Sequence, residues 1–158
     1  LARSVADPQD REARDGMSLA ATLAGMAFSN CGVALVHALE YPLGGALHCS
    51  HGAGNGLLLP YVMEYNLPER IDKLARVAEL LGADCAGGTP EQSARQAIEM
   101  VRQLRLEIGV PDRIREIGGT SEQLPQFASK SFEIKRLMTI NPRTPSEADL
   151  LEILQTAL

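Results

Sequence analysis

The stretch His37–His51 reads HALEYPLGGALHCSH and holds every histidine of the chain: His37, His48 and His51. A glycine-rich run, GAGNG at 52–56, follows it directly. Imidazole is the commonest metal-binding side chain at neutral pH. The metal-binding potential of this chain is therefore concentrated in one short segment, which we expect to form a corner between two helices.

The spacing of two of these histidines restricts the geometry of any shared site. His37 and His51 lie 14 positions apart. On one continuous helix they would be separated by about 21 Å, at about 1.5 Å per residue. Two ligands of one ion each lie about 2.0–2.2 Å from it. A straight helix through this segment therefore excludes a shared metal ion.

Helix-breaking residues between the two histidines offer a way around this exclusion. Pro42 lacks a backbone donor and clashes with the preceding turn, and the glycines at 44 and 45 permit backbone conformations closed to other residues. The pattern predicts a helix ending near Tyr41, a reversal through 42–50 and a new helix from about Gly52. Two interpretations stay open. Either the histidines share a metal, or His37 is a hydrogen-bonded core residue and His51 merely neighbours a helix N-cap.

Composition limits the classes of function. A chain of 158 residues with 45% hydrophobic and 22% charged residues is typical of one globular domain. Its net charge of −5 argues against a nucleic-acid partner and against a basic membrane-binding surface. We find no uninterrupted 18-residue apolar run and no signal peptide. Cys31, Cys49 and Cys85 form no CxxC pair, which is compatible with a reducing cytoplasm.

Hydrophobic periodicity predicts helices and gives no confident strand. The expected fold class is all-α, a bundle of seven or eight helices. The helices are expected over 7–30, 31–41, from 51 through a kink or stop at Pro60, 68–81, 90–108, a short turn within 111–119, 121–138 and a last segment from about 145.

Particular residues support the ends of these helices. Asp7 before Pro8 is expected to cap the first helix, and capping boxes are expected at Thr89–Gln92 and Thr144–Glu147. Small residues at helical spacing within the first helix indicate close contact with another helix, and they are Ala20, Ala24 and Ala27.

Other candidate site residues lie near the histidines. The glycine-rich run lacks the GxxxxGK[ST] phosphate-loop pattern, so a nucleotide cradle is not expected there. Tyr41 and Tyr61 are candidate proton donors, although tyrosines of this kind usually serve packing. Cys49 is either a ligand or, more often for such a residue, an inert buried thiol. Ser50 has no Asp–His arrangement that would indicate a hydrolase.

Two longer segments resemble one known family. GMAFSNCGVALVHALEYPLGG followed by HCSHGAGNGLLLPYVMEYN resembles the signature region of the iron-containing alcohol dehydrogenases. The downstream segments IGVPDRIREIG and NPRTPSEADLLEIL resemble the same family, so the likeness extends over essentially all of residues 1–158. It implies the C-terminal all-helical domain of the dehydroquinate synthase-like, or iron-containing alcohol dehydrogenase, fold.

The resemblance also implies a metal site and an activity. Family members combine an N-terminal α/β domain that binds NAD(P) with a helical domain that holds Fe²⁺, or in some members Zn²⁺. Four ligands are used: an Asp and a His on an early helix, then two histidines that match His37 and His51. The metal acts as a Lewis acid on the oxygen of a small alcohol, while hydride passes between that alcohol and nicotinamide.

Two departures from the family pattern qualify this expectation. No Asp-x-x-x-His occurs before His37, and the cofactor domain is absent, so we expect this chain to be the C-terminal part of a longer enzyme and inactive alone. Many members also carry a histidine four residues after the first matched ligand, near the nicotinamide, whereas this chain has Tyr41. The departure therefore affects the proton-relay role at this position and not the membership of the family.

Two alternatives remain beside the metal-dependent dehydrogenase. A metal-free enzyme similar to maleylacetate reductases belongs to the same superfamily, although VHALEYPLGG disfavours it. A non-catalytic helical interaction domain would leave the histidines merely packed. In either dehydrogenase interpretation the expected partners are the N-terminal cofactor domain and a second copy in a homodimer or larger oligomer.

Overall fold

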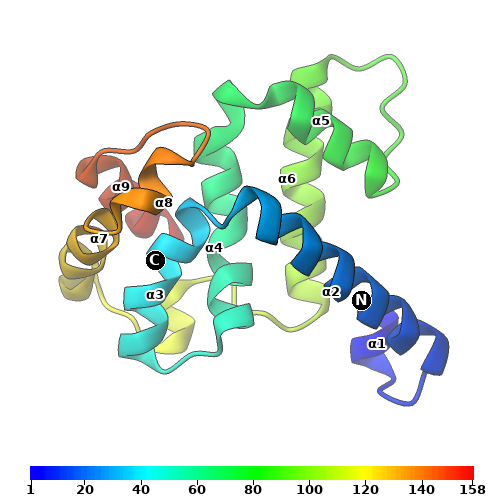
Figure 1. The fold of residues 1–158 in the computed structure, drawn as a ribbon, viewed down its shortest axis with the longest axis horizontal. Coiled ribbons are helices and arrows are strands. Elements are labelled where there is room, and N and C mark those ends of the chain that lie inside the picture. Colours follow the sequence, from blue (N-terminus) through cyan, green and yellow to red (C-terminus); the bar gives the residue numbers. More distant parts are fainter.

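The computed structural model describes residues 1–158 and contains helices only, which confirms the all-α prediction (Figure 1). Nine α-helices and three short 3₁₀ helices are present. Seven or eight helices were expected, and the α-helices include two of only five residues that the sequence analysis did not predict separately. Their bounds are α1 Ala2–Ala6, α2 Arg11–Cys31, α3 Leu35–Leu47, α4 His51–Asn66, η1 Leu67–Glu69, α5 Ile71–Leu80, α6 Pro90–Glu107, η2 Ile114–Ile117, η3 Ser121–Gln123, α7 Leu124–Phe132, α8 Lys135–Thr139 and α9 Glu147–Ala157.

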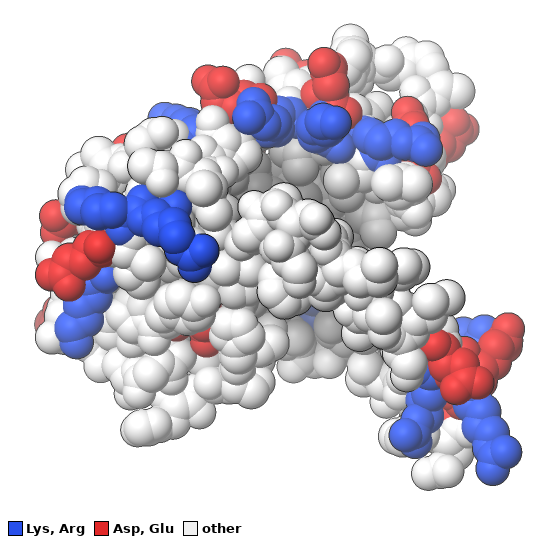
Figure 2. Space-filling model, viewed as in Figure 1, with Lys and Arg blue, Asp and Glu red and all other residues white.

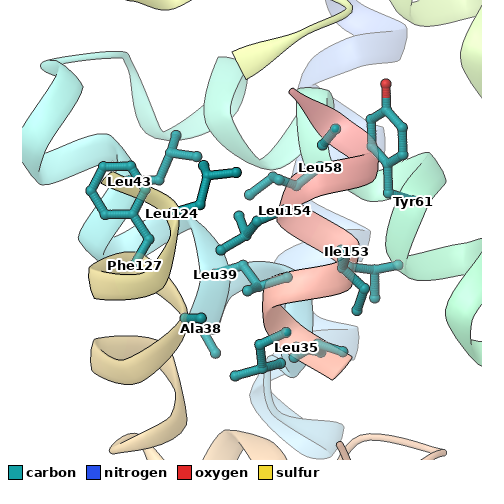
Figure 3. Packing of buried hydrophobic residues seen from close by; sticks show 14 of the residues in the cluster. Leu35, Ala38, Leu39, Leu43, Leu58, Tyr61, Leu124, Phe127, Ile153 and Leu154 are labelled. Carbon is teal, nitrogen blue, oxygen red and sulfur yellow. The ribbon is translucent and has the colours of Figure 1, made fainter. Parts of the chain in front are cut away.

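One hydrophobic core joins α3, α4, α7 and α9. Leu35, Leu39 and Leu43 form a stripe along α3 and are fully buried. They meet Phe127 of α7 and Leu154 of α9 (Figure 3). Each fully buried leucine stabilises the fold by about 1.5–3 kcal/mol relative to an exposed one. This stripe fixes the position of α3, and hence of the polar residues on its other face.

The α5–α6 pair forms a smaller unit beside this core, with its own cluster of Leu67, Ala94 and Ile98. Arg105 of α6 is buried. Its guanidinium donates to the carbonyl oxygen of Leu57 at 2.8 Å and pairs with Asp112. This buried cation ties α6 to the middle of α4.

Several predicted helix ends are shifted. Asp10, not Asp7, caps α2 by accepting from the Ala13 amide, because the Asp7 carboxylate instead accepts from Gln9 within a turn. The capping box at Thr89 is confirmed.

The last two predicted helices also differ from the sequence expectation. The expected box at Thr144 lies two residues later, at Ser146 with Asp149. The single helix expected over 121–138 is divided into η3, α7 and α8.

The connection between α3 and α4 is shorter than the sequence predicted, because it covers residues 48–50 rather than 42–50. The helix does not end near Tyr41 but continues through Pro42 to Leu47. A proline removes one helical hydrogen bond, and burial of the leucines on both sides of it outweighs that loss. His48 then adopts a left-handed conformation, with φ of 53°, and α4 begins at His51. Pro60 likewise lies within α4 without ending it.

The second helix stands apart from the core. None of the 21 residues of α2 is buried, so the close helix contact expected at Ala20, Ala24 and Ala27 does not occur within this chain. Leu19 and Met26 are each about three-fifths exposed. Uncharged surface covers the middle of α2, and charged side chains gather at its end beside α1 (Figure 2).

No single helix is long and apolar enough to span a bilayer, and only α2 and α3 together, bent by 108°, meet that length and composition.

Leu39 provides a test of the core that holds α3. Leu39→Ala should lower the free energy of unfolding by about 2–5 kcal/mol, because it leaves a cavity among fully buried side chains. Leu59→Ala, on the partly exposed face of α4, is the matched control and should change it by less than about 1 kcal/mol. Denaturant unfolding followed by far-UV circular dichroism measures both, and equal losses would contradict this description of the core.

Candidate metal centre

The turn between α3 and α4 brings two distant histidines together. His37 lies in the first turns of α3, and His51 is the first residue of α4. Their ring centroids are 5.2 Å apart, with the ring planes tilted by 57°. The reversal at residues 48–50 therefore removes the separation that a continuous helix would impose.

Tyr41 lies beside both histidine rings. Its ring is stacked on that of His51, with centroids 6.1 Å apart, and meets that of His37 edge-on at 6.3 Å. The residue is 46% exposed, so its hydroxyl is not confined to the protein interior. The three side chains form one cluster of rings at the corner.

The other candidate site residues from the sequence lie outside this cluster of rings or have a structural role. Tyr61 is buried, and its hydroxyl donates to the carbonyl oxygen of Asp112 at 2.9 Å, which assigns it to packing. His48 is exposed and terminates α3. Burial, and secondarily the Glu40 carboxylate, raise the pKa of the Cys49 thiol, so this thiol stays protonated at neutral pH. Ser50 caps α4 by accepting from Ala53 at 3.4 Å.

Glu40 is a site residue that the sequence analysis missed. It is only 4% exposed, and its Oε2 lies 2.6 Å from Nδ1 of His51. Because an ionised carboxylate can only accept a hydrogen bond, Nδ1 of His51 is the donor. The other ring nitrogen of His51, Nε2, is then left without a proton and is available as a ligand.

Two glycines make room for this carboxylate between the helices. A Cβ at Gly44 would overlap with Oε1 of Glu40. A Cβ at Gly54 would lie 2.8 Å from Cγ of Glu40, closer than Cβ atoms approach other atoms in proteins, and 3.1 Å from Sγ of Cys49, which is tighter than most such contacts. The glycines of this region therefore serve close packing around Glu40.

Asn55 is a second polar neighbour of His51. Its side-chain amide donates to the backbone carbonyl of His51 at 2.9 Å and lies 3.2 Å from both ring nitrogens. Its Oδ1 is buried without a hydrogen-bond partner. A buried acceptor of this kind normally has a hydrogen-bond partner. Oδ1 of Asn55, close to His51, can therefore accept a further hydrogen bond.

Electrostatics favour the metal-binding form of the other histidine. Partial burial, and then the proximity of His51, lower the pKa of His37, while Glu40 opposes this shift. His37 is therefore neutral at neutral pH. Metal ions bind the neutral form of imidazole.

The two histidines fit half of a metal site. Two imidazoles bound to one tetrahedral ion through nitrogens about 2.1 Å from it have ring centres about 5 Å apart, close to the separation found here. No group of three or more His, Cys, Asp or Glu side chains is arranged to hold a metal. The histidine pair is therefore a candidate for two ligands of a metal ion.

An apolar groove adjoins the histidine pair. It has a volume of about 450 Å³ and opens between the end of α2, the start of α3 and one side of α4. Its lining includes Phe28, Val36, Leu59, Met63 and, at one end, His37. A small organic molecule in this groove would lie within reach of an ion held by the histidines.

Comparison with known proteins identifies the family. The sequence model described as "Fe-containing alcohol dehydrogenase family, C-terminal" matches residues 1–158. This chain belongs to the iron-containing alcohol dehydrogenase family. The resemblance noted in the sequence is thereby confirmed.

Similar proteins agree with this family in sequence and in fold. The chain is 34% identical to 1,3-propanediol dehydrogenase of Klebsiella pneumoniae over 157 residues, which is 99% of this chain and 40% of that protein. It is 33% identical to NAD-dependent methanol dehydrogenase of Bacillus methanolicus, covering 100% and 41% of the two chains. The crystal structure of a 1,3-propanediol oxidoreductase superposes with a TM-score of 0.96 at 34% identity, over 99% of this chain and 41% of that one.

The lengths show how much of such a protein this chain represents. It spans about two-fifths of the relatives that it matches. The helical, C-terminal part of the family fold is present.

The sequence contains one indication that Glu40 belongs to the site. It is the only charged residue in the apolar stretch from Cys31 to Leu47, and it lies one helical turn after His37. Residues three positions apart share a helix face. The burial of its carboxylate, however, depends on the approach of α4, which the sequence alone does not specify.

The glycines around Glu40 allow a paired test. Gly54→Ala should lower the free energy of unfolding by about 1–3 kcal/mol, because the added methyl group overpacks the space held by Glu40 and Cys49. Gly52 lies two residues before Gly54, and a Cβ there would meet no other atom within 4 Å. Gly52→Ala should therefore leave the free energy of unfolding unchanged or raise it by up to about 1 kcal/mol. Chemical denaturation measures both, and a stabilised Gly54→Ala protein would contradict the packing described here.

Proposed function

We propose that this chain is the metal-holding part of an NAD(P)-dependent alcohol dehydrogenase, with His37 and His51 as two ligands of Fe²⁺ or, alternatively, Zn²⁺. The observation that carries the proposal is the 5.2 Å separation of the two rings, with Nδ1 of His51 engaged by Glu40. Membership of the iron-containing alcohol dehydrogenase family supports the same assignment.

The residues of this chain would contribute binding and orientation to the reaction. A bound divalent ion supplies Lewis acidity at the oxygen of the alcohol or aldehyde. His37 and His51 would hold the ion, and His37 also lines the groove. The groove would receive the carbon chain of the substrate against its apolar lining. Tyr41, beside both histidines, is the candidate for moving a proton at the substrate oxygen.

The groove is suited to the carbon chain of an alcohol or aldehyde. Its volume of about 450 Å³ and its mostly apolar lining are typical of a small-molecule site. The similar proteins include a 1,3-propanediol dehydrogenase and a methanol dehydrogenase, which supports this class.

The remaining parts of the enzyme would come from outside this chain. We infer that an N-terminal domain supplies the NAD(P) site and the other metal ligands, since this chain spans about two-fifths of its relatives and offers two ligands. The isolated chain should therefore lack hydride transfer. A homodimeric or oligomeric cytoplasmic enzyme without nucleic-acid or membrane partners completes the proposal.

Replacement of His51 tests the metal role in the full-length protein, comprising this chain and the part that precedes it in its relatives. His51→Ala should abolish NAD(P)-dependent alcohol oxidation and remove the bound metal measured by elemental analysis, because the ion loses a direct ligand. His48→Asn is the control, since His48 is exposed and asparagine tolerates its left-handed conformation. Full activity of His51→Ala, or an active wild type without metal, would refute the proposal and favour a metal-free reductase.

Tyr41→Phe separates proton transfer from packing. The variant keeps the ring beside the histidines and loses only the hydroxyl, so metal content should be unchanged. The value of kcat should fall about 100-fold if the hydroxyl moves a proton in the reaction, as expected here. Tyr65→Phe, whose hydroxyl donates to Thr144 elsewhere, serves as the control. A change in kcat of less than threefold would assign Tyr41 to packing.

A further inference from the structure

We propose that Glu40 is a positioning residue that fixes the tautomer and the orientation of His51 for metal binding. This inference rests on the proposed function, because it assigns a role toward the ion that His51 would hold. It concerns a side chain that touches neither the ion nor the substrate.

The burial of Glu40 is the first argument. It is the only carboxylate among the buried residues of the chain. Arg105, the other buried charged residue, is paired with Asp112, whereas the one ionic partner of Glu40 is His51. Burial of a carboxylate is unfavourable unless the group is paired and hydrogen-bonded. Glu40 therefore depends on His51 as much as His51 depends on Glu40.

The second argument is the space kept for the carboxylate. Gly44 on α3 and Gly54 on α4 both lie against Glu40, and a methyl group at either position would displace it. Glycine within a helix is less favourable than alanine by about 1 kcal/mol. Two helices thus carry an unfavourable residue at the points where Glu40 requires room.

The direction of the hydrogen bond gives the consequence. With Nδ1–H of His51 directed at Oε2 of Glu40 at 2.6 Å, the ring cannot rotate freely although its side chain is 58% exposed. Nε2 then carries a lone pair and no proton, and the side-chain amide nitrogen of Asn55 lies 3.2 Å from it. The negative charge behind the ring also increases the electron-donating strength of that nitrogen. Glu40 thereby prepares an exposed histidine as a ligand before metal arrives.

The position of Glu40 on α3 links the two histidines. His37 and Glu40 are three residues apart on this helix, so α3 provides one ligand directly and orients the other across the turn. The ring of Tyr41, on the same helix, lies nearly parallel to that of His51, with centroids 6.1 Å apart. The pair is therefore arranged by one helix rather than by two independently mobile side chains.

Glu40→Gln and Glu40→Ala test this role in the chain itself, with Glu64→Gln as the control on the exposed face of α4. Two-bond ¹H–¹⁵N NMR of the histidine side chains reads the tautomer, and calorimetric titration with Zn²⁺ reads the affinity. In the wild type, His51 should be protonated at Nδ1 only, whereas exposed His48 should show mixed tautomers.

The variants should separate positioning from stability. Glu40→Ala should give mixed tautomers at His51 and weaken Zn²⁺ binding about 10- to 100-fold. Glu40→Gln retains an acceptor and the volume of the side chain, so it should preserve the tautomer and weaken binding less. Its midpoint of unfolding should stay or rise, because it no longer buries a charge. A purely structural role would change affinity and stability in the same direction.

Each outcome has a defined meaning. Unchanged tautomer and Zn²⁺ affinity within twofold in Glu40→Ala would overturn the positioning role. If the wild type binds no Zn²⁺ at its histidines, the proposed metal function fails. The NMR tautomers of wild type and Glu40→Ala then still show whether Glu40 orients His51. An effect of similar size in Glu64→Gln would indicate a general charge effect and would also overturn the proposal.

Discussion

The absence of side chains at Gly44 and Gly54 is the constraint on which the histidine corner depends. These two positions let α3 and α4 enclose the carboxylate of Glu40, which no larger residue there would permit. Once enclosed, the carboxylate finds its partner in Nδ1 of His51 at 2.6 Å. The ring centroid of His51 then lies 5.2 Å from that of His37. Close helix packing thus sets the arrangement of the two histidine rings that we propose as metal ligands.

The opposite face of α3 explains why this arrangement is stable. Leu35, Leu39 and Leu43 anchor that face in the main core, and their burial holds the helix together across Pro42. The polar face carries His37 and Glu40 and is turned toward α4. One amphipathic helix therefore connects the hydrophobic core to the chemistry of the site, as surface helices commonly do.

Local sequence signals predicted much of this fold, and tertiary contacts decided the remainder. The capping box at Thr89 depends on residues three positions apart, so the sequence contained it fully. The continuation of α3 through Pro42 depended on burial against helices far along the chain. The exposure of α2 was not predictable, since its apolar composition is typical of a helix packed against partners. Glu40 was missed because its burial arises only when α4 closes over it.

A double-mutant cycle of metal binding tests most directly whether His37 and His51 share one ion. Anaerobic calorimetric titration with Zn²⁺ would compare the wild type with His37→Ala, His51→Ala and the protein carrying both changes. If the two rings hold one ion, the wild type binds one Zn²⁺ weakly, and either single change abolishes that binding as completely as both together. Independent, additive losses, or Zn²⁺ binding that survives in the double variant, would contradict the shared site.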